Sequence, residues 1–339
     1  MGQRYPACCL RARCLLGERG ALQEVVRLSV AVSARGLRKL YGRGVALDDL
    51  TLDVQSGTIA GLVGPDGAGK STAIRVLSTA VAPTAGTARV GGYDIRTDPE
   101  RVRSIVGVVP QAFTLYGDLT VRENLDFLAT VYGVDLSEAR ARSASLLASA
   151  RLVGHERKLA GDLSGGMKRK LAVVSALIHR PSILLLDEPT AGVDPVSRRE
   201  VWKMLGELAS DGITVVVTTA YMDEAERCHT VAVMQSGRVV VVGSPNELRG
   251  LVRDAIIVVT GLGVSSAATS IRSLPDVTGI RVVGNQLRVS ATSSDGAVVR
   301  RIVSAAVEAG VADAVARPVT PSIEDVFLSL RAVGDGSAP

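Results

Sequence analysis

A glycine-rich loop at residues 64–72 constrains this chain more than any other segment. It fits the pattern G-x-x-x-x-G-K-[ST] and lies between an apolar run at 58–63, predicted to be a buried strand, and a predicted helix at 71–79. Glycines let backbone N–H groups approach phosphate oxygens, and the helix points its positive end at them. The loop is expected to bind a nucleoside triphosphate through Gly64, Pro65, Asp66, Gly67, Ala68, Gly69, Lys70, Ser71 and Thr72.

Two side chains of this loop carry the chemistry. Lys70 is expected to reach the β- and γ-phosphates, and the Ser71 hydroxyl to hold Mg²⁺. A glycine-rich turn with a chance lysine is the competing interpretation, and the strand and helix on either side disfavour it.

The surrounding pattern predicts an α/β fold. Continuous apolar runs are typical of parallel strands that are buried on both faces, and helices are expected between them. Ser236-Gly237 is a predicted hairpin turn. The predicted strands of this part are 45–54, 58–63, 105–109, 182–187, 213–218, 231–235 and 238–243.

Two regions differ from this α/β pattern. Residues 112–180 contain almost no strand signal and are predicted to form a helical subdomain, with helices at 120–132, 137–151 and 164–180. After residue 250 the order becomes β-α-β-β-α-β, typical of a ferredoxin-like α+β unit. Its predicted strands are 254–260, 278–283, 286–291 and 312–317, its helices are 264–273 and 296–309, and a last helix follows at 322–331.

The expected organisation is therefore two folded domains with short ends. Residues 31–250 form the nucleotide-binding domain and 251–331 a small accessory domain, in keeping with a length of 339 residues. Residues 332–339 are a tail. Residues 1–30 are expected to be a disordered segment or a stretch upstream of the true start of translation.

Composition excludes some classes of function. The net charge of +5 comes from the basic N-terminal stretch, and aromatic residues make up only 3% of the chain. Few aromatic platforms for base stacking are therefore present, and no nucleic-acid partner is expected. Cys8, Cys9 and Cys14 lack a nearby histidine and make a poor zinc site, so reduced thiols are expected. No run reaches the ~18 apolar residues of a membrane helix.

A second apolar strand ends in two carboxylates, Asp187 and Glu188. Asp187 suits the shell of a magnesium ion. Glu188, one residue later, suits a general base that orients the attacking water. The competing interpretation is a strand that merely ends in solvated acids, and the apolar residues 183–186 disfavour it.

A second candidate anion cradle lies about twenty residues before that strand. Small residues at a helix N-terminus offer free N–H groups to an anion. One nucleotide needs one cradle, and the loop at 64–72 supplies it, so the second is explained if it serves a nucleotide held by another subunit. A simple helix cap is the alternative. The segment is Leu163-Ser164-Gly165-Gly166-Met167.

These motifs together resemble the nucleotide-binding subunits of ABC transporters, over residues 33–245. The resemblance implies that two such domains close head-to-tail over two ATP molecules. It also implies roles for single residues. Tyr41 stacks on adenine, and Gln111 touches Mg²⁺ beside Ser71 and Asp187 and takes part in catalysis with Glu188. Leu163–Met167 form the signature motif that faces the ATP of the other subunit, and Asp194 lies in a loop at the dimer interface.

A finer resemblance is to drug exporters of the daunorubicin-resistance type. Segments 115–125, 192–199 and 321–327 carry it. It implies a separate integral-membrane permease as partner, a location at the cytoplasmic face of the cell membrane through that permease, and export of a drug or several drugs. The identity of the transported molecule does not follow from the sequence.

Ala220 departs from the family pattern. The family carries a histidine there that contacts the γ-phosphate, and a methyl group cannot donate a hydrogen bond. We expect strong ATP binding but weak hydrolysis by a homodimer. The alternative to a homodimer is pairing with a second, histidine-bearing cassette. Asp66 replaces the commoner asparagine and is interpreted as a mark of the subfamily.

Two other functions stay open at this stage. A soluble ABC ATPase that acts on ribosomes or nucleic acid usually has two cassettes or a long coiled-coil insertion, and neither is evident. A regulatory ATP sensor, in which binding without turnover drives dimerisation, is kept open by Ala220.

Overall fold

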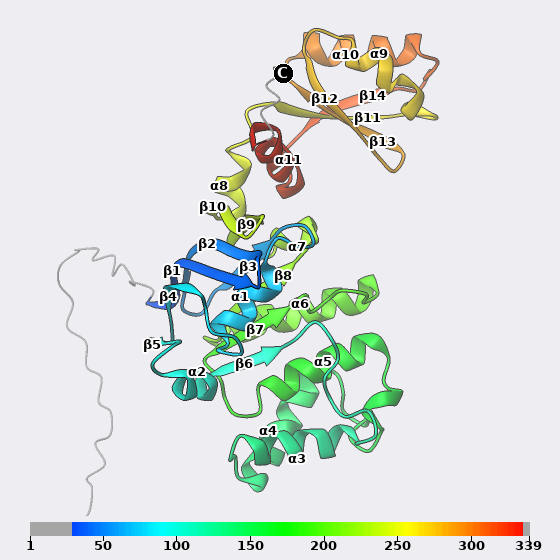
Figure 1. The fold of residues 1–339 in the computed structure, drawn as a ribbon. Coiled ribbons are helices and arrows are strands. Elements are labelled where there is room, and N and C mark those ends of the chain that lie inside the picture. The colour runs from blue at the N-terminus through cyan, green and yellow to red at the C-terminus, as the bar shows by residue number, and fades with distance from the viewer. Residues whose placement is uncertain (1–28, 335–339) are drawn as a thin grey trace, which may run out of the picture.

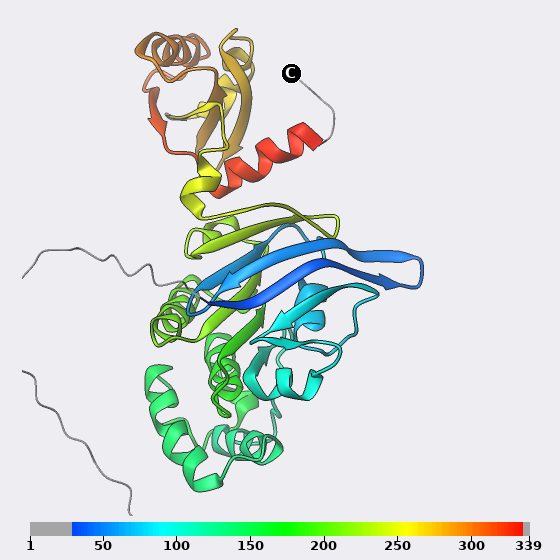
Figure 2. The same ribbon diagram turned by 90° about the vertical axis from the view of Figure 1, so that its left-hand side faces the viewer.

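The computed structural model describes residues 29–334 of the chain. The predictions for residues 1–28, which include Cys8, Cys9 and Cys14, and for 335–339 lie outside the described residues. The strands form one large and one small sheet, and helices pack against both (Figures 1 and 2).

Three buried parallel strands form the centre of the large sheet. β3 (Ile59–Val63), β8 (Thr214–Thr219) and β7 (Ile183–Asp187) are neighbours in that order, and all their residues are buried. They are the three continuous apolar runs of the sequence, so the prediction of strands buried on both faces is confirmed. Because parallel strands end at one edge, the segments after residues 63, 187 and 219 leave the sheet together.

The large sheet continues on both sides of this centre. β6 (Val106–Val109) runs parallel to β7, and β9 (Thr230–Gln235) runs parallel to β3. β10 (Arg238–Gly243) pairs antiparallel with β9 through the predicted turn at Ser236-Gly237. The full order is β5-β4-β1-β2-β10-β9-β3-β8-β7-β6.

An antiparallel wing makes up the other side of the large sheet. It contains β1 (Val30–Tyr41), β2 (Gly44–Gln55), β4 (Ala85–Val90) and β5 (Tyr93–Asp94). The sequence predicted only β2, as 45–54. Exposed charged side chains interrupt the apolar pattern of β1 and β4, so hydrophobic periodicity did not predict these strands.

Helices cover the two faces of the large sheet. α1 (Lys70–Leu77) packs Ala73 and Leu77 into one core, and α6 (Pro195–Ser210) packs Trp202 and Leu205 into the other. Short helices α2 (Pro99–Ile105), α7 (Met222–Ala225) and α8 (Pro245–Arg249) complete this part.

The helical region predicted at 112–180 contains α3 (Val121–Val131), α4 (Leu136–Ser149), the 3₁₀ turn η1 (Ala160–Asp162) and α5 (Gly165–Ala176). Figure 1 shows α3 and α4 at the end of the molecule opposite the small sheet. The predicted helix 164–180 stops earlier, because α5 ends at Ala176 and a turn leads to β7.

The small sheet has the order β12-β13-β11-β14, and every neighbouring pair is antiparallel. This is the strand order of a ferredoxin-like unit, so the fold class is confirmed for this part as well. Its elements are β11 (Ala255–Thr260), η2 (Val264–Ala267), α9 (Ala268–Arg272), β12 (Val277–Val283), β13 (Gln286–Ala291), α10 (Gly296–Glu308) and β14 (Val315–Val319).

The strand predicted at 312–317 lies slightly later in the chain, since β14 is Val315–Val319 and contains Pro318. A proline lacks the N–H that a ladder hydrogen bond needs, so within sheets it is confined mainly to edge strands. β14 is an edge strand, and an edge accepts the proline.

The last helix, α11 (Ile323–Gly334), follows the small unit in the sequence but packs its apolar side chains against the large unit. Its side chains Ile323, Val326 and Phe327 join the core that contains Ala225 of α7. The sequence placed this helix within the accessory domain, but its apolar face belongs to the large unit. Figure 2 shows the helix, in red, between the large sheet and the small one.

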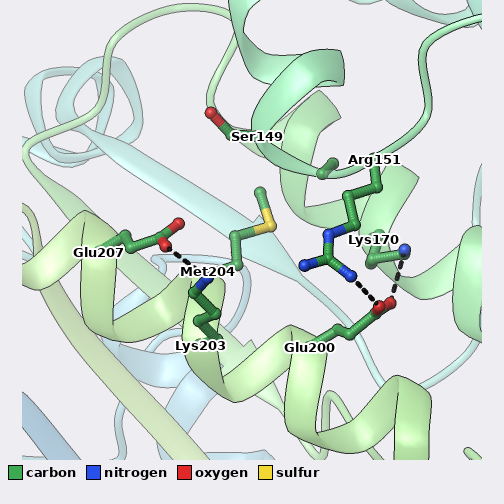
Figure 3. A pocket seen from close by; sticks show the side chains of 8 residues that line it. Ser149, Arg151, Lys170, Glu200, Lys203, Met204 and Glu207 are labelled. Carbon is green, nitrogen blue, oxygen red and sulfur yellow. Dashed lines mark hydrogen bonds and ion pairs between the residues drawn. The ribbon is translucent and has the colours of Figure 1, made fainter.

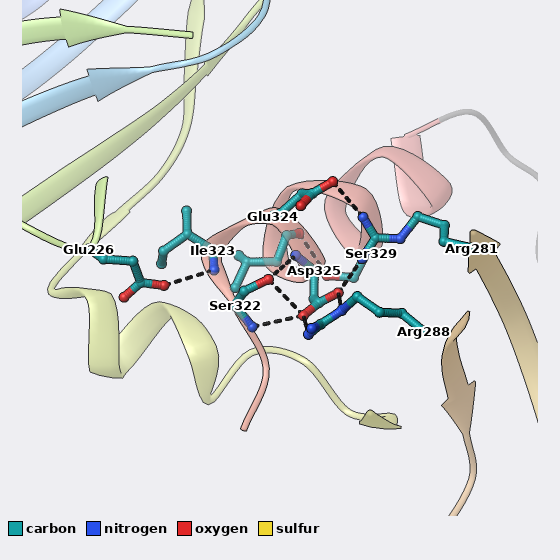
Figure 4. Close-up of polar contacts among 9 residues, drawn as sticks. Glu226, Arg281, Arg288, Ser322, Ile323, Glu324, Asp325 and Ser329 are labelled. Carbon is teal, nitrogen blue, oxygen red and sulfur yellow. Dashed lines mark hydrogen bonds and ion pairs between the residues drawn. The ribbon is translucent and has the colours of Figure 1, made fainter. Parts of the chain in front are cut away.

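A buried carboxylate fastens α11 to the small sheet. Asp325 is 6% exposed and accepts hydrogen bonds from Arg281 and Arg288 of the two neighbouring strands. On the opposite side, the backbone N–H of Ile323 donates to Glu226, at 3.2 Å (Figure 4). The helix therefore bridges the two units.

Candidate nucleotide site

One cleft of about 610 Å³ brings most of the predicted nucleotide residues together. Its walls come from the β1–β2 hairpin, the loop after β3, the segment after β6 and the end of β7. The lining residues are Tyr41, Gly44, Val45, Ala46, Asp66, Gly67, Gly69, Lys70, Ser71, Thr72, Gln111 and Glu188.

The glycines of the loop are required by its geometry. A Cβ at Gly64 would lie 2.3 Å from the carbonyl oxygen of Met234, and one at Gly69 would lie 2.5 Å from that of Ala46. Gly69, at φ 99°, is also the N-cap of α1 in a backbone conformation that favours glycine. The loop is thus held close to neighbouring backbone with its N–H groups at the helix N-terminus.

Lys70 is 4% exposed, although it carries a charge. Its Nζ donates to the carbonyl oxygens of Gly64 at 2.9 Å and Pro65 at 3.1 Å, and it lies 3.1 Å from Oε1 of Glu188. These contacts offset the cost of burying the ammonium group. Asp66 is 95% exposed and 3.7 Å from Lys70, so most of its charge is solvated.

Ser71 and Asp187 lie beside each other at the end of β7. The Ser71 hydroxyl donates to Oδ1 of Asp187 at 3.0 Å, and the Thr218 hydroxyl donates to the same oxygen at 2.7 Å. Hydroxyl and carboxylate oxygens are ligands suited to Mg²⁺, which uses few protein oxygens together with substrate phosphates. This donor set therefore fits a magnesium ion bound with a nucleotide.

Glu188 is held in an unusual backbone conformation, with φ 47°. Its N–H donates to Thr218 Oγ1 at 2.9 Å, which helps to fix the turn that follows β7. Oε2 of its carboxylate accepts a hydrogen bond from Nε2 of Gln111 at 3.0 Å. The two candidate catalytic side chains are thus in direct contact.

Tyr41 lines the opposite side of the cleft and is 47% exposed. The Nζ of Lys39 lies 5.1 Å from the centroid of its ring. An exposed ring beside a cation provides a surface on which a planar base can stack.

The predicted signature segment does not line the cleft. Ser164 caps α5 by accepting the N–H of Met167 at 3.3 Å, while Gly165 has open space around it. A Cβ at Gly166 would lie 2.2 Å from Oγ of Ser197, so α5 and α6 approach closely there. The segment therefore lies next to the start of α6, and none of its residues is among those that line the cleft.

Asp194 is the N-cap of α6 and accepts the N–H groups of Val196 at 3.0 Å and Ser197 at 2.9 Å. Hydrogen bonds from Ser197 hold the pKa of its carboxyl below the usual range. The Asp194 side chain thus caps α6 and also holds Ser197, the residue that Gly166 of α5 approaches.

Ala220 directly follows β8, between the strands that lead to Lys70 and to Glu188. The preceding Thr219 accepts the N–H of Tyr221 at 2.9 Å and donates to the buried Glu224 at 2.6 Å. The segment is therefore well anchored, and its side chain at position 220 is a methyl group with no donor.

A network of ion pairs joins the helical region to α6 (Figure 3). Glu200 pairs with Arg151 at 2.8 Å and with the buried Lys170 at 3.0 Å. Lys203 and Glu207 of the same helix form a looser, exposed pair at 3.7 Å. This network lies outside the nucleotide cleft and fixes α5 against α6.

Two contributors to the site were missed by the sequence reasoning. Thr218 contacts both acids at the end of β7, but a threonine in a strand gives no signal of this role. Arg169 of α5 donates to backbone carbonyls around Gln111. The basic run of residues 168–170 directly after the signature segment could have pointed to it.

Comparison with known proteins agrees with this geometry. The family model described as ABC transporter matches residues 47–191. The daunorubicin resistance ATP-binding protein DrrA3 of Streptomyces coeruleorubidus is 36% identical over 306 residues, covering 88% of this chain and 95% of that protein. This chain belongs to the ABC transporter family of ATP-binding proteins. It is thus an ATP-binding ABC ATPase similar to drug-resistance ATP-binding proteins.

Other relatives support the same assignment. The linearmycin resistance ATP-binding protein LnrL of Bacillus subtilis is 34% identical, covering 78% of this chain and 86% of that protein. The solved structure titled "Dimeric structure of a post-hydrolysis state of the ATP-binding cassette MJ0796 bound to ADP and Pi" is similar with a TM-score of 0.58 and 28% identity, covering 63% of this chain and 98% of that one.

Proposed function

We propose that this ABC ATPase couples ATP binding and hydrolysis to export of a drug-like molecule through a separate membrane permease. The observation that carries the proposal is the contact of Lys70 and Gln111 with Glu188 inside the cleft that Tyr41 borders. Such an arrangement can bind a triphosphate and position a base beside it.

The roles within the cleft follow from the chemistry of each side chain. Tyr41 stacks on the base, while the backbone of the loop and Lys70 bind the phosphates. Ser71 and Asp187, with Gln111 nearby, hold a magnesium ion, which supplies charge neutralisation for the phosphates when it is bound. Glu188 orients water and accepts its proton.

Two copies of the cassette are proposed to form the complete site. Ser164–Met167 lie away from the cleft of their own chain, at the N-terminus of α5, so they suit a nucleotide held by a second subunit. Asp194 lies beside them and caps α6. The similar structure of a dimeric cassette bound to ADP and phosphate supports the arrangement.

The permease and the transported class are proposed from the relatives. Among the described residues, none of the helices has the length and apolar character to cross a membrane. The names of similar proteins refer to daunorubicin and linearmycin resistance. We place the chain at the cytoplasmic face of the membrane, bound to an integral-membrane partner.

A second candidate function is an ATP sensor that turns over slowly. Ala220 favours it, because the residue directly follows β8, the strand between those that lead to Lys70 and to Glu188, and cannot donate to a γ-phosphate. In this case the pairing partner would be a cassette with a histidine at the matching position.

Reconstitution tests the proposal. The chain is purified together with a membrane permease that copurifies with it, placed in lipid vesicles and assayed for phosphate release and for drug accumulation. ATP-dependent accumulation that Glu188→Gln abolishes is the expected result. ATP binding with no accumulation and no stimulation by the permease would favour the sensor instead.

A further inference from the structure

Two of the three basic residues that follow the signature segment, Arg169 and Lys170, are withdrawn from solvent in part or almost fully. Lys168, Arg169 and Lys170 would be expected on a solvated helix face, yet Arg169 is partly buried and Lys170 is 6% exposed. Burial lowers the pKa of the Arg169 guanidinium, since the charged form is costly there. A buried cation needs partners that offset this cost, and those partners reveal its role.

Arg169 finds these partners on the backbone of the segment after β6. One terminal nitrogen donates to the carbonyl oxygen of Pro110 at 3.1 Å, and the other donates to that of Gln111 at 2.9 Å. Within residues 29–334 no carboxylate lies at ion-pair distance from it. The planar fork of arginine suits two adjacent acceptors, which the single ammonium of lysine cannot match.

A second contact from the same turn holds the same segment. The Nζ of Lys168 lies 5.7 Å from the centroid of the Phe113 ring. Phe113 in turn packs against the core of the large unit. The first turns of α5 therefore hold the chain on both sides of Gln111.

The position of the Gln111 backbone matters because its side chain contacts Glu188. Nε2 of Gln111 lies 3.0 Å from Oε2 of Glu188, whose other oxygen pairs with Lys70. A displacement of about 1 Å at such a site can cost roughly 100-fold in rate. The contacts thus run without a gap from α5 through Arg169 and Gln111 to Glu188.

We propose that Arg169 is a positioning residue that couples the signature helix to Glu188 of the same chain. α5 begins with the segment that suits the nucleotide of the other subunit, and Arg169 ties this helix to the candidate catalytic carboxylate of its own cleft. When α5 closes on the nucleotide of the other subunit, the position of Glu188 in its own cleft is therefore set as well. The inference rests on the proposed roles of Glu188 and Gln111.

The test compares Arg169→Lys with a matched control in the full-length chain. Arg140→Lys is the control, because Arg140 lies in the same helical region and pairs with the surface carboxylate of Asp126 at 2.9 Å. Arg169→Lys should lower kcat for ATP hydrolysis about 10- to 100-fold, with KM for ATP changed less than about twofold. Arg140→Lys should leave both constants at the wild-type value.

A double-mutant cycle separates positioning from general damage. If Arg169 acts through Gln111, Arg169→Lys combined with Gln111→Ala should be no slower than Gln111→Ala alone. Multiplicative losses, or an unchanged kcat in Arg169→Lys, would overturn the inference. Thermal unfolding of both arginine variants should agree within a few degrees, and a large selective loss for Arg169→Lys would assign it a structural role.

Glu188→Gln distinguishes failure of this inference from failure of the proposed function. If Glu188→Gln is inactive while Arg169→Lys turns over at the wild-type rate, only the coupling role is wrong. If Glu188→Gln hydrolyses ATP at the wild-type rate, the proposed catalytic role fails, and the inference fails with it.

Discussion

The Nζ of the buried Lys70 lies 3.1 Å from Oε1 of the partly buried Glu188, so the candidate phosphate ligand and the candidate base form an ion pair. Glu188 also accepts a hydrogen bond from Gln111. A triphosphate that enters the cleft competes with the carboxylate for the same ammonium group. Nucleotide binding is therefore expected to free an oxygen of Glu188 for water.

Removal of the ammonium group should weaken ATP binding. Lys70→Ala loses a charge-assisted hydrogen bond of about 1.5–3 kcal/mol, which corresponds to roughly 10- to 100-fold in affinity. Titration with a fluorescent ATP analogue measures the change. Lys203→Ala is a suitable comparison, since Lys203 forms an exposed pair with Glu207 of α6 and does not line the cleft. Equal affinities of Lys70→Ala and the wild type would contradict the role of Lys70.

Restoration of a donor after β8 should speed hydrolysis. Ala220→His places an imidazole directly after β8, the strand between those that lead to Lys70 and to Glu188, and one such donor is worth about 100-fold or more in rate. We expect at least a tenfold rise in phosphate release by the purified chain. Ala220→Leu adds bulk without a donor and should give no rise. A histidine variant as slow as the leucine variant would contradict the prediction.

The Glu200 network should contribute more to stability than a surface pair on the same helix. Glu200→Gln leaves the buried Lys170 without a carboxylate, at a cost of about 1–3 kcal/mol in the free energy of unfolding. Glu207→Gln removes only the exposed pair with Lys203, which is worth less than about 1 kcal/mol. Urea denaturation measures both, and equal losses in the two variants would show that the burial of Lys170 is unimportant.

Acid should loosen the attachment of α11 through Asp325. Burial raises the pKa of this carboxyl, but hydrogen bonds from Arg288 and Ser322 outweigh it and leave the pKa below the ordinary value. A lowered folded-state pKa means that the stabilisation is complete above the unfolded-state pKa, about 4, and is lost as the pH falls through the folded-state value.

Asp325→Asn should therefore be less stable than the wild type at pH 7, by about 3 kcal/mol, and the difference should shrink below pH 4. Urea denaturation at several pH values, followed by circular dichroism, measures it. Asp276→Asn is the comparison, because Asp276 pairs with Arg301 at the surface of the small unit. A pH-independent difference for Asp325→Asn would contradict the assignment.

The sequence alone determined the chemistry of the cleft. The loop 64–72 needs glycines where its backbone approaches Ala46 and Met234, and these glycines can be recognised in the amino-acid sequence as a local motif. The apolar runs of β3, β7 and β8 are likewise local signals, because a strand buried on both faces must be apolar throughout. Because these signals are local, the sequence predicts the fold class, the nucleotide loop and the strand that ends in Asp187 and Glu188.

Only the tertiary structure decided which of these residues meet. The contact of Gln111 with Glu188, the fork of Arg169 on two carbonyls and the separation of Ser164 from the cleft depend on strand order and helix packing. The amphipathic pattern of α11 showed that it had an apolar face but not which unit would cover it. Contacts between segments far apart in the chain are set by packing of the whole, and local pattern does not encode them.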